Sequence, residues 1–265
     1  MAGKIRIDRH LAESGLSESR EKAKREILAG WVKVDGETIR DPSREVTGAE
    51  RITVERPGGL FVSRGGEKLS KALDYFSIDL SGRVCADLGA STGGFTDCML
   101  TKGAVKVYAV DVGYGQLDYR LRSDSRVVVM ERTNARAIAK DMFPDKISFV
   151  SSDLSFISFT KVYPAISSVF GPVEGVALIK PQFEAETSEH KKGVVVKEEN
   201  HVRIVGRTLE ALAGAGLVIR GLTFSPITGP KGNIEFLLHY TAGEGKSVAV
   251  DVAAVVAEAH ASLGR

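Results

Sequence analysis

The chain has 265 residues, of which 43% are hydrophobic and 26% are charged. This balance is typical of a soluble globular protein and excludes a disordered or collagen-like chain, while the length allows one large domain or two. The formal net charge of +2 neither requires nor excludes a nucleic-acid partner. Two cysteines, Cys85 and Cys98, favour a reducing, cytoplasmic setting, and we expect no metal site. No apolar run approaches the roughly 18 residues that span a bilayer, so no membrane partner is expected.

The first 56 residues predict a small module in which short helices precede short strands. We expect a helix that is capped by Ser17 and followed by Gly30. Its apolar face would be formed by Ala23, Ile27 and Leu28. Residues 31–39 then alternate about an Asp-Gly pair, which is a strong β-hairpin signal, and residues 51–55 predict another strand.

Basic residues gather on the predicted helix and hairpin of this module. A charge run alone is more often a solvated face than a binding site. The order helix, helix, glycine, hairpin over residues 7–36 resembles the RNA-binding module of ribosomal protein S-four. This resemblance implies contacts with the phosphates of structured RNA rather than a reading of its bases. The residues expected to bind RNA are Arg6, Arg20, Lys24, Arg25, Lys33 and Arg64.

From about residue 80 the pattern alternates strand and helix, which predicts a doubly wound, largely parallel sheet. Apolar runs predict strands at residues 84–88, 105–110, 127–130, 147–150, 176–179, 217–224 and 234–239. The connection over residues 225–233 is too short for a helical crossover, so the last two strands should pair antiparallel. Seven strands with an antiparallel last one form the methyltransferase variant of the Rossmann-like sheet.

The expected organisation is therefore a small α+β RNA-binding domain at residues 1–56, a linker at 57–62 and an α/β Rossmann-like methyltransferase domain at 63–265. The linker is predicted from the Arg-Pro-Gly-Gly sequence that begins at residue 56. The C-terminal tail has apolar residues at helical spacing and should pack back on the sheet. These residues are Val248, Val252, Val255, Val256 and Ala259.

A Gly-rich turn follows the first strand of the larger domain, at residues 87–95. Such a turn lets a ligand approach backbone N–H groups, but this one is neither the dinucleotide pattern nor a P-loop. The second strand ends at Asp111, whose carboxylate can bind both hydroxyls of a cofactor ribose. This combination suits S-adenosylmethionine, although Asp87 alone could be a turn residue. The expected cofactor-binding residues are Asp87, Gly89, Ser91, Thr92, Gly93, Gly94, Asp111, Asn134 and Asp153.

Charged residues stand at the ends of later strands. Asp153 and Lys180 each follow a predicted strand, and Glu235 lies on the last one. Singly, each could be solvated, and Lys68 alone would be taken for an exposed helix lysine. Open α/β sheets bind ligands at the carboxyl ends of their strands, so charges on otherwise apolar strands there favour a functional site.

The order Lys68, Asp153, Lys180 and Glu235 resembles the Lys-Asp-Lys-Glu tetrad of the FtsJ-like RNA 2′-O-methyltransferases. Longer phrases resemble the TlyA family more specifically, at residues 62–66, 87–97, 111–117, 131–136, 180–183 and 229–235. The resemblance implies methylation of cytidine 2′-hydroxyls in ribosomal RNA of the large subunit or of both subunits. Ribosomal RNA or ribosomal subunits are then the expected partners, without an obligate protein partner. Some family members also carry a haemolysin label.

Methyl transfer to a ribose requires an in-line arrangement and removal of a proton from a weakly acidic alcohol. Lys180 is the candidate base, and Lys68 as a second cation would help it to lose its own proton. The tetrad order implies that Asp153 orients Lys180 and that Glu235 orients Lys68 or the ribose.

Two other functions stay open at this point. A non-catalytic RNA-binding ribosome-assembly factor would not need the complete tetrad. A haemolysin-like membrane-active protein would need an interfacial amphipathic helix, and the C-terminal tail has little of the basic charge typical of one.

Overall fold

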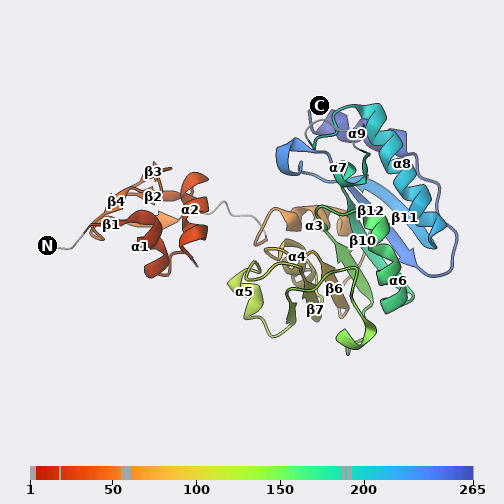
Figure 1. Ribbon diagram of the computed structural model, residues 1–265, viewed down its shortest axis with the longest axis horizontal. Coiled ribbons are helices and arrows are strands. Elements are labelled where there is room, and N and C mark those ends of the chain that lie inside the picture. The colour runs from red at the N-terminus through yellow and green to blue at the C-terminus, as the bar shows by residue number, and fades with distance from the viewer. Residues whose placement is uncertain (1–3, 18, 55–60, 187–188, 190–192, 265) are drawn as a thin grey trace. The chain divides into compact units, whose positions relative to one another are not determined.

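The computed structural model describes residues 4–17, 19–54, 61–186, 189 and 193–264. The chain divides into two compact units, Met1–Gly59 and Leu60–Arg265, and each has its own helices and strands (Figure 1). Most of the expected linker at 57–62 lies outside the described residues. Each unit is therefore considered by itself.

The first unit is a small α+β fold. Its elements are β1 (Ile5–Arg6), α1 (Ile7–Glu13), α2 (Arg20–Leu28), β2 (Val32–Val34), β3 (Glu37–Ile39), β4 (Glu45–Val46) and β5 (Ile52–Val54). β1 pairs with β4, and a three-stranded antiparallel sheet has the order β3-β2-β5. The two helices and both sheets enclose one apolar core, formed by Ile7, Leu11, Ala23, Ile27, Val32, Val34, Ile39 and Val46.

The hairpin prediction in this unit is confirmed, and the helix prediction needs two corrections. β2 and β3 pair across Asp35 and Gly36, whose φ angles of 51° and 86° are those a two-residue hairpin turn requires. The N-cap of α2 is Ser19, not Ser17, because Ser19 is extended and its hydroxyl accepts from the backbone N–H of the first turn. Ser17 is instead buried. Leu28 lies outside the apolar face and is 60% exposed.

The second unit is built on a seven-stranded sheet of order β11-β12-β10-β9-β6-β7-β8. Its strands are β6 (Val84–Leu88), β7 (Lys106–Val110), β8 (Val127–Met130), β9 (Phe149–Ser152), β10 (Val173–Ile179), β11 (Leu217–Phe224) and β12 (Phe236–Ala242). β12 runs antiparallel to both of its neighbours, β10 and β11, and the remaining pairs are parallel. The expected seven strands with an antiparallel last one are confirmed.

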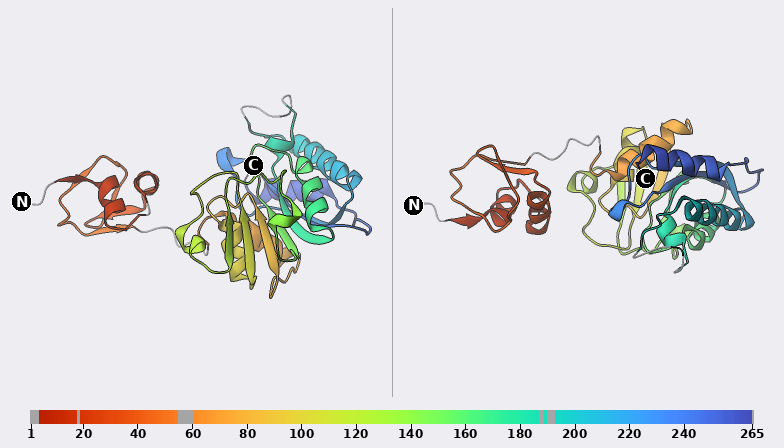
Figure 2. Two further views of the ribbon diagram at one scale, coloured as in Figure 1. Left: turned by 60° about the horizontal axis from the view of Figure 1, so that its bottom comes forward. Right: turned by 90° about the horizontal axis from the view of Figure 1, so that it is seen from above.

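Helices cover both faces of this sheet. Side chains alternate along each strand, so each face of the sheet carries its own set of apolar residues for the helices to cover. On β7, Val107 and Ala109 join the core beneath α3 and α4, whereas Tyr108 and Val110 join the core beneath α6 and α8. The right view of Figure 2 shows the sheet between α3 in orange and α8 in teal. The helices are α3 (Gly65–Tyr75), α4 (Gly94–Thr101), α5 (Tyr119–Arg122), α6 (Tyr163–Phe170), α7 (Pro181–Glu184), α8 (Glu198–Gly214) and α9 (Val252–Ser262), with short 3₁₀ helices η1 (Lys140–Met142), η2 (Phe159–Lys161) and η4 (Pro230–Gly232).

The C-terminal tail folds back on the sheet as expected. Figure 1 shows α9 beside α8. Val256 and Ala259 of α9 are buried in the core that α8 and β11 share. Val248 is not part of this helix, because its amide donates to the carbonyl of Ile219 and the chain there runs extended beside β11.

A polar cluster lies at the start of β10, remote from the carboxyl ends of the parallel strands. The carboxylate of Glu174 accepts a hydrogen bond from His239 Nε2 at 2.9 Å and forms an ion pair with Arg83. The hydrogen bond from His239, followed by the contacts with Arg83, lowers the pKa of Glu174 to about 2. The ionised carboxylate therefore stabilises the fold.

We expect Glu174→Gln to lower the free energy of unfolding by about 2–3 kcal/mol at pH 7. Because the folded-state pKa lies below the ordinary value of 4.5, this contribution is complete above pH 4.5 and is lost as the pH falls toward about 2. This contribution is measured by urea unfolding of the wild type and of Glu174→Gln. The measurements are made at pH 7, at pH 4.5 and at the lowest pH where the wild type folds.

The matched control is Asp74→Asn, which removes an exposed pair with Lys102 and should cost less than about 1 kcal/mol. If the difference in the free energy of unfolding between the wild type and Glu174→Gln stays constant below pH 4.5, the prediction is wrong.

Candidate active site

A cavity of about 670 Å³ opens at the carboxyl ends of the parallel strands. Its wall is formed by the start of α3, the Gly-rich turn after β6, the segments that follow β9 and β10, and the loop that precedes β12. This volume lies within the range of small-molecule sites. The sheet topology thus brings segments from distant parts of the chain to one place.

Two ion pairs line this cavity. Lys68 Nζ donates to Glu235 Oε2 at 2.6 Å, and Lys180 Nζ lies 2.5 Å from Asp153 Oδ1. Lys180 also donates to Ser155 Oγ at 3.1 Å. Both lysines are 8% exposed and Glu235 is fully buried. Since a buried charge is stable only when it is paired, each carboxylate fixes the position of its lysine.

The four residues of the predicted tetrad therefore meet in one cavity. Asp153 contacts Lys180, and of the two partners considered for Glu235, the structure shows Lys68. Each ammonium group has its own carboxylate, so Lys68 does not face Lys180 as an unpaired cation.

Glu235 carries an oxygen with no internal partner. Among the described residues, nothing hydrogen-bonds to its Oε1, which is buried. A Cβ atom at Gly229 would lie only 2.2 Å from that oxygen, so the loop before β12 passes it only without a side chain. Leaving such an atom unsatisfied costs on the order of 1–3 kcal/mol, and violations of this kind concentrate at functional sites.

The Gly-rich turn is held by its neighbours on both sides. Asp111 Oδ2 accepts from the backbone N–H of Ser91 at 2.8 Å, which fastens the end of β7 to the turn. Gly89 has a φ of +88°, and a Cβ there would lie 2.4 Å from the carbonyl oxygen of Asp153. A Cβ on Gly94 would lie 2.3 Å from Ser63 Oγ. The glycines thus allow the turn to pack directly against the segments that carry Asp153 and Lys68.

The expected cofactor residues fall into two groups. Those in the cavity wall are Gly89, Ser91, Thr92, Gly94 and Asp153. Gly93 is the N-cap of α4, and Asn134 is exposed, with its Oδ1 accepting from the backbone N–H of Arg136. Like these two, Asp87 and Asp111 are not part of the wall.

Asp87 is fully buried beneath the turn. Its carboxylate accepts from Thr96 Oγ1 at 2.6 Å and from Ser151 Oγ at 2.9 Å, and burial raises its pKa to about 6. These bonds tie β6 to α4 and to β9. The geometry therefore favours the alternative in which Asp87 supports the turn.

Sequence reasoning did not single out Phe156, which stands beside the ion pair of Asp153. Its side chain is 90% exposed, its φ is +64°, and its ring lies 5.2 Å from that of Phe183. Both rings line the cavity. A left-handed backbone at an aromatic residue costs on the order of 1–3 kcal/mol and occurs mainly at functional sites. An aromatic residue within a Ser-rich segment was the only sequence signal.

In the first unit, a buried carboxylate holds two of the expected RNA-binding arginines. Asp8 is fully buried and accepts from Arg6 Nη2 at 3.0 Å and from Arg20 Nε at 3.1 Å. The side chains of Arg6 and Arg20 remain 44% and 50% exposed. Two guanidinium groups fixed at a surface are suited to binding a phosphate.

The other expected RNA-binding residues differ in their surroundings. Lys24 pairs with Glu21 at 2.6 Å, Arg25 is exposed near the end of α2, and Lys33 is half-buried on β2. Arg64 belongs to the second unit, where it lines the cavity.

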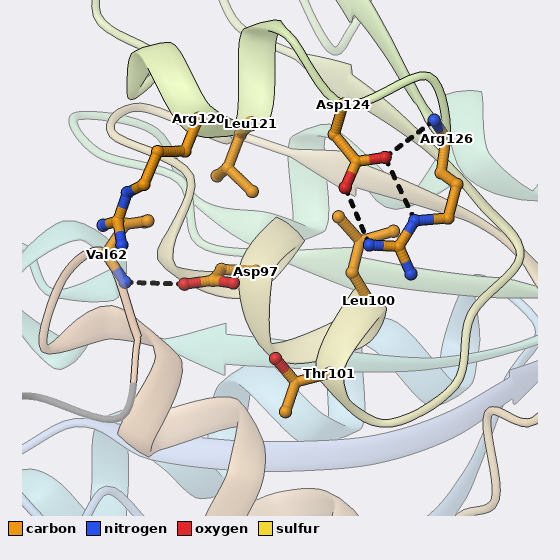
Figure 3. Close-up of a pocket in the computed structure, with 8 residues that line it drawn as sticks. All are labelled: Val62, Asp97, Leu100, Thr101, Arg120, Leu121, Asp124 and Arg126. Carbon is orange, nitrogen blue, oxygen red and sulfur yellow. Dashed lines mark hydrogen bonds and ion pairs between the residues drawn. The ribbon is translucent and has the colours of Figure 1, made fainter.

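A smaller cavity of about 200 Å³ lies between α4, α5 and the residues before β8. Figure 3 shows two interacting pairs in its wall: the guanidinium of Arg126 points to Asp124, and the carboxylate of Asp97 accepts a hydrogen bond from the backbone N–H of Val62 at 2.7 Å. None of the predicted catalytic or cofactor residues lines it. The larger cavity is therefore the candidate active site.

The described residues offer neither a membrane-spanning helix nor a metal site. No helix there is long and apolar enough to cross a membrane. No group of three or more His, Cys, Asp or Glu side chains there could hold a metal ion.

The chain belongs to the FtsJ-like methyltransferase family, whose model matches residues 61–242, and a model of the S4 domain matches residues 5–52. The second unit thus has the fold of S-adenosylmethionine-dependent methyltransferases. The chain is 41% identical over 244 residues to TlyA of Mycobacterium tuberculosis, named a 16S/23S rRNA (cytidine-2′-O)-methyltransferase, covering 90% of each chain. It is 44% identical to Hemolysin A of Brachyspira hyodysenteriae over 89% of this chain and 99% of that one. A solved structure of a hemolysin-labelled protein from Streptococcus thermophilus is 38% identical, with a TM-score of 0.79, covering 100% of this chain and 98% of that one.

We expect Gly94→Ala to destabilise the second unit by about 1–3 kcal/mol, because the new Cβ would lie 2.8 Å from the backbone nitrogen of Gly66 as well as against Ser63. The matched control is Gly206→Ala on α8, where a Cβ meets nothing within 4 Å. That change should stabilise the helix by about 0.5–1 kcal/mol. Urea unfolding measures the free energy of unfolding of both variants. If both changes raise it, or both lower it, the prediction based on packing at Gly94 is wrong.

Proposed function

We propose that this chain transfers the methyl group of S-adenosylmethionine to the 2′-hydroxyl of cytidine in ribosomal RNA. The observation that carries the proposal is the convergence of two ion pairs, Lys68–Glu235 and Lys180–Asp153, in one cavity beside a Gly-rich turn. The match to the FtsJ-like family supports methyl transfer, and the name of the Mycobacterium tuberculosis relative supports the cytidine and the ribosomal RNA. This activity implies that the protein acts in the cytoplasm.

The cavity fits this cofactor in its size and in its chemistry. A volume of about 670 Å³ accommodates a nucleoside with an amino-acid side chain and leaves an opening for a second substrate. The turn offers the hydroxyls of Ser91 and Thr92, both exposed, and no bulky side chain at Gly89 or Gly94. Asp111 lies outside the cavity wall, but its carboxylate accepts a hydrogen bond from Ser91 in that wall, and it is the group that would bind the ribose hydroxyls at this end of the cavity.

When bound, S-adenosylmethionine supplies an electrophilic methyl group to an oxygen nucleophile. Lys180 would act as a neutral amine: its ammonium group first releases a proton to solvent, and its Nζ then accepts the proton of the ribose hydroxyl as the oxygen attacks the methyl group. Asp153, 2.5 Å away, holds the ammonium group that results, and Ser155 Oγ fixes the direction of Nζ as a further contact. Alignment of the reacting groups can contribute roughly 7–11 kcal/mol to such a reaction, so the positions of these side chains matter as much as their basicity.

The remaining residues of the cavity would place the nucleotide. Phe156 offers an exposed ring on which a base can stack, as bases do in many RNA enzymes and RNA-binding modules. Arg64 and Lys231 line the cavity and are exposed, so they are suited to phosphates on either side of the target. The ion pair of Lys68 with Glu235 would hold the start of α3, which carries Lys68, against the loop before β12 in the cavity wall.

The first unit would bind ribosomal RNA or a ribosomal subunit through backbone phosphates. Arg6 and Arg20 are held by Asp8 while half of each side chain stays exposed, so little side-chain freedom is lost when a phosphate binds. Lys24, Arg25 and Lys33 would add weaker contacts.

The experiment that tests the proposal follows tritiated methyl groups from S-adenosylmethionine into ribosomal RNA and identifies the modified nucleoside. We expect 2′-O-methylcytidine to form with the wild type. Lys180→Ala should lower the rate about 100-fold or more, because the proton acceptor is lost, while cofactor affinity changes only a few-fold.

Lys102→Ala serves as a control, since it removes a lysine that pairs with Asp74 away from the cavity. Full activity of Lys180→Ala would rule out Lys180 as the base. Methyl groups on a base rather than on a ribose would rule out the proposed reaction.

Replacing both Arg6 and Arg20 by glutamine should weaken RNA binding and flatten its salt dependence. Each lost phosphate contact lowers the slope of log affinity against log salt by about 0.7–0.9. Filter binding to a ribosomal RNA fragment between 50 and 200 mM salt (about the range where such effects are large) measures it. Arg126→Gln, which removes a guanidinium engaged with Asp124, is the control and should leave the slope unchanged. An unchanged slope in the double variant would count against the module's role.

A further inference from the structure

Two segments that carry catalytic groups run side by side along the cavity. One follows β9, at residues 153–159, and the other follows β10, at residues 180–184. Three successive sets of side-chain contacts join them. These are Lys180 with Asp153 and Ser155, the ring of Phe183 with that of Phe156, and Glu184 with Ser158 and Phe159.

Glu184 forms the last set of contacts with both of its oxygens. Its Oε1 accepts from the backbone N–H of Phe159 at 2.8 Å, and its Oε2 accepts from the hydroxyl of Ser158. Glu184 lies one helical turn after Lys180, and its own amide donates to the carbonyl of Lys180 at 3.2 Å. One helical turn therefore carries both the candidate base, Lys180, and the carboxylate that accepts hydrogen bonds from the opposite segment.

The segment between these two anchors is strained. Phe156 has a φ of +64°, and its side chain is almost entirely exposed, so packing of this side chain into a core cannot hold the backbone there. A left-handed residue of this kind persists only where the surrounding structure fixes it on both sides. Lys180 fixes the preceding side through Asp153 and Ser155, and Glu184 fixes the following side.

Stability alone does not explain a carboxylate at this position. Burial raises the pKa of Glu184, and this effect exceeds the opposing effects of Ser158, Phe159 and the cations Arg207 and Lys161. A carboxylate of intermediate exposure whose charged form is disfavoured adds little to the free energy of folding, so its two contacts with the opposite segment are the feature to be explained.

We propose that Glu184 is a positioning residue for methyl transfer, which holds residues 155–159 so that Asp153, Ser155 and Phe156 keep their places beside Lys180. Glu184 does not line the cavity itself and acts through the segment that it binds. The inference rests on the proposed function.

The test compares single-turnover methyl transfer to ribosomal RNA, with cofactor and RNA affinities, for wild type, Glu184→Ala and Glu184→Gln. All rates are measured at a temperature well below the midpoint of thermal unfolding of each variant. Glu184→Ala should lower the rate about tenfold or more, with both affinities within about twofold of the wild type, because a small displacement of reacting groups has effects of this size. Glu184→Gln should recover most of the rate, since its amide can still accept from Phe159 and donate to Ser158.

Glu186→Ala, two residues after Glu184, is the control: its exposed carboxylate pairs with Arg207, and its loss should leave the rate unchanged. Hydrogen exchange supplies a second readout, in which Glu184→Ala should expose the Phe159 amide while β9 and β10 stay protected. A folded Glu184→Ala with the wild-type rate would overturn the inference while leaving the proposed function intact.

If Glu184→Ala does not fold, Ser158→Ala carries the test, because it removes one of the two donors to Glu184. Its rate should fall about threefold or more, and an unchanged rate would overturn the inference. A wild type that forms no 2′-O-methylcytidine would overturn the proposed function instead, and this inference with it.

Discussion

The pairing of two lysines with two carboxylates at one edge of the sheet is the interaction on which the rest of the site depends. Removing one partner of a buried pair typically costs about 3–5 kcal/mol, so each lysine has an essentially obligatory neighbour. The sheet order supplies these neighbours. β9 and β12 both flank β10, and because β12 is antiparallel, its beginning lies at the edge where the parallel strands end. Glu235 can therefore join Asp153 and Lys180 there.

Close backbone packing joins the cofactor side of the cavity to the catalytic side. Gly89 lies against the carbonyl of Asp153, and Gly94 lies against the start of α3, which carries Lys68. The turn that would bind the methyl donor is thus in direct contact with the segments that would act on the methyl acceptor. Asp87 and Asp111 anchor this turn from the strands beneath it. A rigid frame of this kind suits a reaction in which alignment is a large part of catalysis.

The sequence predicted the architecture well because its apolar runs are bounded by clear turns. β6 and β11 coincide with their predicted limits, and the tetrad could be identified because its order resembles a known pattern. Local details were less predictable. Ser17 and Ser19 are equally good caps by residue type, and only the packing of the module decides between them. The burial of Asp87 and the exposure of Phe156 follow from the arrangement of neighbouring segments, for which periodicity gives no signal.

The place of β12 in the sheet has a consequence for the nascent chain. β12 follows β11 along the chain but is inserted between β10 and β11, so until it is synthesised β10 has an unpaired edge and β11 lacks the strand that joins it to the sheet. Open edges of this kind invite pairing with other chains. Glu235, the carboxylate that pairs with Lys68, immediately precedes this strand. Synthesis must therefore pass β12 before this unit can close, and a product that stops short of residue 235 would have both an aggregation-prone sheet and an incomplete tetrad.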